Sequence, residues 1–88
     1  MENLILTPEQ FLEDDLMACS DYIDDGAAYF IFSMDPTVDR IFQFDGAFRE
    51  KNKDKAVAQR LMWERCGRNT AFLTSVDILF LVNQLQID

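Results

Sequence analysis

The first strong pattern in the chain is a helical spacing of apolar residues near the N-terminus. Four of them follow one another at intervals of four, three and four residues: Leu12, Leu16, Cys19 and Ile23. On an α-helix these intervals place the four side chains on one face, while the residues between them are mostly acidic. The pattern therefore predicts an amphipathic helix whose apolar face is turned toward the core.

The boundaries of this N-terminal helix are marked by local signals. Thr7 can cap a helix, Pro8 suits the first helical position, and Gln10 can reach back to complete a capping box. We expect the helix to begin there and to run to about Asp25. It should end at Gly26, because glycine readily takes the left-handed conformation common at helix ends.

The next segment, residues 27–45, predicts a β-hairpin. Residues 27–33 are aromatic and β-branched, residues 40–45 alternate in part, and Asp35-Pro36 between them is typical of a turn. A helix is the competing interpretation, with Asp35 as its cap and Pro36 at its first position. We favour the hairpin because Gly46 would destabilise the interior of a helix.

A further helix is predicted from about Asn52 to Cys66, with its end at Gly67. Within it Val57 and Leu61 point the same way, with Ala58 and Met62 beside them. Trp63 lies off that stripe.

The C-terminal segment begins with Thr74-Ser75-Val76-Asp77, a capping-box pattern before an apolar run. As a helix it aligns one apolar set: Ile78, Leu81, Val82 and Leu85. A second stripe on the same helix is formed by Val76, Phe80 and Ile87. As a strand, residues 78–82 would instead be a buried central run.

These elements predict one small α+β domain over residues 1–88, with an N-terminal amphipathic helix, a β-hairpin and two further helices. If the C-terminal segment is a strand, the order becomes β-α-β-β-α-β, which is the ferredoxin-like arrangement. If residues 27–45 are helical, the domain is all-α. The length of 88 residues leaves no room for a second hydrophobic core.

Composition narrows the classes of function. The chain has no histidine, which excludes Ser-His-Asp and Cys-His catalysis and the common zinc sites. Its three glycines are too far apart to build a phosphate-binding loop, and its acidic residues lie on a solvated helix face that keeps them ionised. We therefore expect no enzyme, no cofactor and no metal site.

The two cysteines, Cys19 and Cys66, are isolated in the sequence, which predicts reduced thiols and a cytoplasmic protein. The net charge is −8. We expect no direct binding to nucleic acid or to a membrane surface, because both are negatively charged.

The charge is distributed unevenly along the chain. Residues 1–39 carry ten acidic residues and no lysine or arginine, whereas all eight basic residues lie within residues 40–68. Such asymmetry bears on binding partners rather than on the fold. The sequence therefore predicts a protein target with a basic surface.

The acidic side of the N-terminal helix is the strongest candidate for a binding site. It carries five acidic residues and one methionine: Glu13, Asp14, Met17, Asp21, Asp24 and Asp25. Along a helix, Asp14, Asp21 and Asp25 are separated by about 10 Å and about 6 Å, which is comparable to the spacing of phosphates in nucleic acid. The sequence thus predicts an inhibitor that acts as a DNA mimic and occupies a nucleic-acid-binding surface. Phage anti-restriction and anti-CRISPR proteins offer an analogy in size and charge.

The alternative is an adaptor, of the antitoxin or immunity type, that binds through apolar residues and forms homodimers. The apolar binding surface, which we call the seam, would combine the second stripe of the C-terminal segment (Val76, Phe80 and Ile87) with Trp63. Tryptophan is a favoured interface anchor. The two hypotheses predict different responses to salt. Screening weakens contacts between exposed charges but hardly affects apolar burial.

Overall fold

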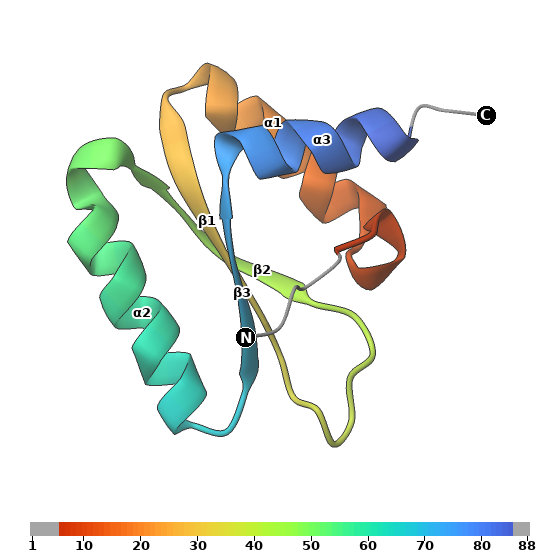
Figure 1. Ribbon diagram of the computed structural model, residues 1–88, viewed down its shortest axis with the longest axis vertical. Coiled ribbons are helices and arrows are strands. Elements are labelled where there is room, and N and C mark those ends of the chain that lie inside the picture. The colour runs from red at the N-terminus through yellow and green to blue at the C-terminus, as the bar shows by residue number, and fades with distance from the viewer. Residues whose placement is uncertain (1–5, 86–88) are drawn as a thin grey trace.

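A three-stranded antiparallel sheet lies at the centre of the fold, with helices on both of its faces (Figure 1). The computed structural model describes residues 6–85. Within them the strands are β1 (Ala27–Met34), β2 (Gln43–Arg49) and β3 (Asn69–Thr74), in the spatial order β2-β1-β3. Both neighbours of β1 run antiparallel to it, so β1 is central while β2 and β3 are edge strands.

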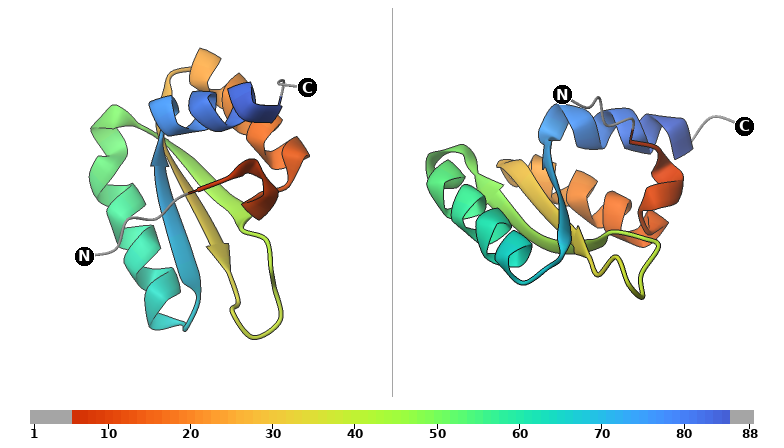
Figure 2. Two further views of the ribbon diagram at one scale, coloured as in Figure 1. Left: turned by 45° about the vertical axis from the view of Figure 1, so that its right-hand side comes forward. Right: turned by 60° about the horizontal axis from the view of Figure 1, so that its bottom comes forward.

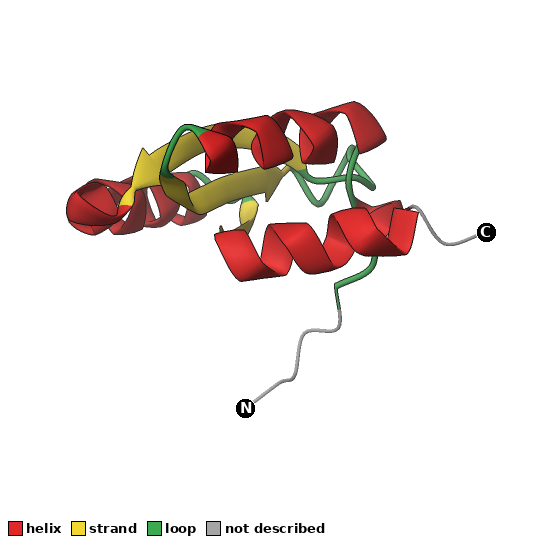
Figure 3. Cartoon of the chain, turned by 90° about the horizontal axis from the view of Figure 1, so that it is seen from above, coloured by secondary structure: helices red, strands yellow, loops and turns green. Residues whose placement is uncertain are grey.

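The helices are distributed unequally over the two faces of the sheet. Helix α2 (Lys53–Arg65) covers one face alone, and helices α1 (Glu13–Asp24) and α3 (Ser75–Leu85) cover the other (Figure 2). Seen from above, α1 and α3 extend along the same side of the sheet, opposite α2 (Figure 3). The expected α+β fold is therefore confirmed for the described residues.

Strand β1 is buried on both faces because it lies between the two helical layers. Phe30 and Phe32 pack into the main core with α1 and α3, whereas Ile31 and Ser33, which alternate with them, are buried outside that cluster. The main core gathers eleven buried residues: Phe11, Leu16, Cys19, Phe30, Phe32, Phe42, Ala71, Leu73, Ile78, Leu81 and Val82.

The N-terminal helix is shorter than predicted. The signals at Thr7–Gln10 start a short 3-10 turn (Pro8–Gln10), in which the Thr7 N–H donates to the Gln10 side chain at 2.8 Å. The chain then extends at Phe11, which forms a parallel bridge with Phe42, and α1 begins only at Glu13. As a result Leu12, expected in the core, is 46 % exposed, and Phe11 is buried in its place.

The predicted helix end at Gly26 is confirmed, since Gly26 has a φ of +99° directly after α1. The hairpin is also confirmed, but its second strand begins at Gln43 rather than at Arg40 and continues through Gly46 to Arg49. Gly46 pairs with Ile31, and a Cβ there would come within 3.1 Å of the Phe48 ring. The helical interpretation of residues 27–45, and with it the all-α alternative, is wrong.

The C-terminal segment is the predicted helix, so the ferredoxin-like alternative is wrong. Its cap is formed as expected: the Thr74 N–H donates to the Asp77 carboxylate at 2.9 Å. Strand β3 directly before it was not predicted. Leu85 is partly buried against the core, and Ile87 lies outside the described residues.

Candidate functional site

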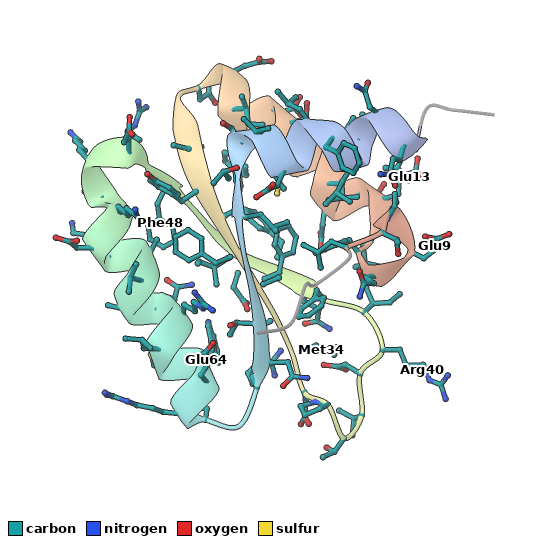
Figure 4. The ribbon with its side chains drawn as sticks, in the orientation of Figure 1. Glu9, Glu13, Met34, Arg40, Phe48 and Glu64 are labelled. Atoms are coloured by element: carbon teal, nitrogen blue, oxygen red, sulfur yellow. The ribbon has the colours of Figure 1, made fainter. Side chains whose placement is uncertain are left out.

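The acidic side of α1 is solvent-exposed over its full length. Leu16 and Cys19 are buried on one side of the helix, and six residues on the opposite side are exposed: Glu13, Asp14, Met17, Asp21, Asp24 and Asp25. We call these six residues the acidic face. Glu13 points away from the body of the protein (Figure 4). Met17, which is 43 % exposed, provides an apolar side chain between the carboxylates.

The carboxylates of the acidic face have no basic partners within the described chain. Among residues 6–85 the only ion pair joins Arg60 and Glu64 on α2, with 3.2 Å between Nε and Oε2. The basic residues of the described chain therefore form no ion pair with the acidic face. An external cation or a basic surface would find these oxygens available.

Asp15 belongs to the fold rather than to the acidic face. Its carboxylate is half-buried and accepts the N–H of Phe44 at 3.2 Å, which links α1 to β2. Burial, together with the nearby Asp15 charge, raises the pKa of the Cys19 thiol to about 12. Cys19 is therefore an unreactive core residue, while Cys66 is a free and exposed thiol.

The C-terminal end of α1 carries charge of the unfavourable sign. Its last turn has no basic residue, and Asp21, Asp24 and Asp25 lie where the helix dipole is negative. Natural chains keep such destabilising groups most readily where they serve a function.

Neutralising this end of α1 should stabilise the protein. We expect the double substitution Asp24→Asn and Asp25→Asn to raise the free energy of unfolding by about 0.5–1.5 kcal/mol at low ionic strength. Urea denaturation followed by Trp63 fluorescence measures the change. Glu13→Gln is the matched control, because Glu13 lies in the first turn, where the same loss of charge should destabilise. Equal effects at both ends would contradict the dipole argument.

The structure does not bring Trp63 to the acidic face. Trp63 lies on α2, half-buried, on the opposite side of the sheet from α1 and α3 (Figure 1). Its indole N–H is buried without a hydrogen-bond partner among the described residues, and the Arg68 guanidinium lies 5.2 Å from the centre of its ring. The sheet also separates Trp63 from Val76 and Phe80 on α3. These three residues of the seam therefore do not form one surface.

The outer side of α3 is apolar and exposed. Val76 is 73 % exposed and Phe80 is 60 % exposed, and Leu79 lies between them in sequence with about half of its surface in solvent. The opposite side of the same helix is buried in the core through Ile78, Leu81 and Val82.

A groove of about 840 Å³ runs along the free edge of β3, and sequence reasoning missed it. Its lining includes the charged residues Arg60, Glu64 and Arg68 and the apolar residues Leu6, Met34 and Phe42. Glu64 and Met34 lie on either side of β3 in Figure 4. The groove could not be anticipated because β3 itself was not predicted.

No helix within residues 6–85 has both the length and the apolar character needed to cross a bilayer. In the same part of the chain, no group of three His, Cys, Asp or Glu side chains is arranged to hold a metal ion. Comparison with protein families, with curated proteins and with solved structures finds no match to this chain.

Proposed function

We propose that the protein is a non-catalytic inhibitor that binds a basic surface of another protein through the acidic face of α1. The target surface is one that otherwise holds the backbone of a nucleic acid. Carboxylates at the spacing found on α1 can replace phosphates as partners of lysine and arginine through charge-assisted hydrogen bonds. Met17 would contribute an apolar contact at the centre of the interface.

One observation carries this proposal: the five carboxylates of the acidic face are exposed side by side on α1 and its C-terminal cap, and none forms an ion pair within residues 6–85. A surface that served solubility alone would not need its acidic residues on one helix, nor at the helix end where they reduce stability. The central location of Met17 fits a binding surface better than a purely solvated one.

Reversing two charges of the acidic face should abolish target binding without unfolding the protein. Asp14→Lys together with Asp21→Lys changes two exposed residues, so circular dichroism and thermal unfolding should remain close to those of the wild type. The control is Glu50→Lys with Asp54→Lys, which changes the net charge equally at two exposed positions near the start of α2. The control variant should bind the target as the wild type does.

The measurement is a pull-down from a cell lysate with the wild type, the reversed variant and the control. A protein that supports the proposal is captured by the wild type and the control only. It is also released by rising salt and by added duplex DNA or RNA, because these compete for the same basic surface. A partner that the reversed variant captures equally well would refute binding through the acidic face.

The exposed apolar side of α3 favours a second candidate, an adaptor that binds a partner by apolar burial. Val76, Leu79 and Phe80 supply this surface without Trp63. Complexes formed there should resist high salt. Substitution of Phe80 should abolish them, while reversal of Asp14 and Asp21 should leave them unchanged.

A further inference from the structure

The outer side of α2 carries a row of four exposed residues at intervals of three, four and three. They are Lys55, Ala58, Met62 and Arg65. This spacing is that of the contact positions of a coiled coil, so the four side chains share one stripe of the helix. Met62 is 49 % exposed in the middle of the stripe, between a basic residue at each end. We call these four residues the basic row.

The acidic residues of α2 lie beside the basic row rather than within it. Glu64 pairs with Arg60 at 3.2 Å and accepts the hydroxyl of Thr70 on β3 at 2.7 Å, so both charges of this pair belong to the side of α2 next to β3. Asp54 precedes Lys55 and is turned from it by about 100° around the helix. The basic row therefore presents a positive charge at both ends and apolar side chains between them.

The acidic face of α1 contains a row with the same spacing. Its members are Asp14, Met17, Asp21 and Asp24, and we call them the acidic row. In both rows a methionine occupies an inner position, and the two end residues are ten residues apart, or about 15 Å along the helix. The two rows are therefore matched in length and opposite in charge.

We propose that the basic row of α2 packs antiparallel against the acidic row of α1 in a second copy of this chain. The register gives four opposed pairs: Arg65 with Asp14, Met62 with Met17, Ala58 with Asp21, and Lys55 with Asp24. Charge-assisted contacts at both ends then flank an apolar contact at the centre.

The antiparallel direction is favoured over the parallel one for two reasons. It brings the acidic C-terminal end of α1, which has no basic residue of its own, to the positive N-terminal end of the α2 dipole. A parallel register would instead set Met62 against Asp21 and lose the contact between the two methionines. Charge complementarity together with this central contact favours a second copy as the occupant of the basic row.

The contact is head-to-tail. Helices α1 and α2 cover opposite faces of the sheet, so one copy cannot pair its own two rows (Figure 2). Each copy in a pair keeps one row of each kind free, and repetition of the contact builds open chains or rings. One helix against one helix is a small interface, so we expect weak association.

The net charge of −8 on each copy opposes this association at low ionic strength. At about 0.1 M salt the Debye length is about 10 Å, which screens the repulsion between remote charges but leaves the opposed pairs in contact. The experiments below therefore use this ionic strength. They use purified protein alone, so the inference does not rest on the proposed function, although a second copy would compete with a target for the same carboxylates.

Sedimentation velocity as a function of concentration tests the association first. The mean mass should rise from 10.2 kDa as the protein is concentrated and should pass twice that value without reaching a plateau. A mass that stays at 10.2 kDa up to millimolar concentration would overturn the proposal, and so would a plateau at the mass of a dimer.

Mixing two neutralised variants tests the head-to-tail contact itself. Asp14→Asn with Asp24→Asn removes the acidic row, and Lys55→Gln with Arg65→Gln removes the basic row. Each variant alone should associate at least about tenfold more weakly than the wild type. The equimolar mixture keeps one intact row of each kind, so it should form dimers and nothing larger. A mixture that remains monomeric, or that forms longer chains, would refute the pairing of these two rows.

A matched pair of substitutions on α2 tests the central contact. Met62→Asp should raise the dissociation constant at least about tenfold, because it sets a carboxylate against the acidic row. Val57→Asp is the control, since Val57 is 38 % exposed on the same helix but lies about 140° around it from Met62. The control should associate as the wild type does. Equal weakening by the two substitutions would show that the basic row is not the interface.

Discussion

Replacing Leu16 by alanine is expected to lower the free energy of unfolding by about 3–4 kcal/mol. Leu16 is fully buried beneath α1 in the main core, and truncation would leave a cavity that the surrounding aromatic side chains cannot fill. A domain of this size has a total stability of roughly 5–10 kcal/mol, so this loss would unfold a measurable fraction of the protein. Urea denaturation followed by the fluorescence of Trp63, the only tryptophan, measures it directly.

Leu12→Ala is the matched control for this prediction. The two leucines are one helical turn apart, but Leu12 precedes α1 and is 46 % exposed, so its truncation should cost less than about 1 kcal/mol. Equal losses at the two positions would mean that Leu12 belongs to the core, as the apolar spacing alone predicts. The experiment therefore decides between the sequence pattern and the structure at this point.

The misplacement of Leu12 has a physical cause. The apolar spacing and the capping signals each identified a real feature, but the two belong to different elements. The signals at Thr7 and Gln10 close a 3-10 turn, after which Phe11 stacks on Phe42 and packs edge-on against Phe32. Burial of the Phe11 ring in the core stabilises the fold more than continuing the helix through residue 11 would. The spacing of apolar residues along the chain carries no information about this tertiary contact.

The second half of the chain was harder to predict for a related reason. Strand β3 is short and joins α3 without a loop. The helix-capping signal at Thr74 therefore follows the strand directly, and no turn residues mark where the strand ends. On α2 the buried position is Ala56, while the larger Val57 and Leu61 are exposed. A helix that packs closely on a sheet needs a small residue at the point of contact. The larger apolar residues of such a helix are therefore a poor guide to which of its faces is buried.

The acidic face was predictable because it depends only on helical periodicity and on charge. Its six residues are exposed as expected, five of them on α1 and Asp25 directly after its end. The groove at β3, by contrast, gathers residues from the N-terminal segment, β1, α2 and α3, which are distant in sequence. Sequence patterning finds sites formed within one element more readily than sites formed between elements.

Replacing Ser33 by alanine is expected to cost about 2–3 kcal/mol, which is large for the loss of one hydroxyl group. Ser33 is the one fully buried polar residue in the described chain. Its hydroxyl donates to the Asp45 carboxylate on β2 and accepts from Nε of Arg68, which precedes β3. Without it, two half-buried charged groups on either side of β1 would lose a shared hydrogen-bond partner. Denaturation in urea gives the change.

A double-mutant cycle separates the contribution of the hydrogen bond between Ser33 and Asp45 from the general cost of changing a buried residue. Ser33→Ala and Asp45→Ala should show a coupling of at least about 1 kcal/mol, because each removes one partner of the same hydrogen bond. The exposed pair of Thr37 and Asp35 has the same chemistry, with 2.7 Å between Oγ1 and Oδ1, and is the control. Thr37→Val with Asp35→Ala should couple by less than about 0.5 kcal/mol, since water replaces the lost partner.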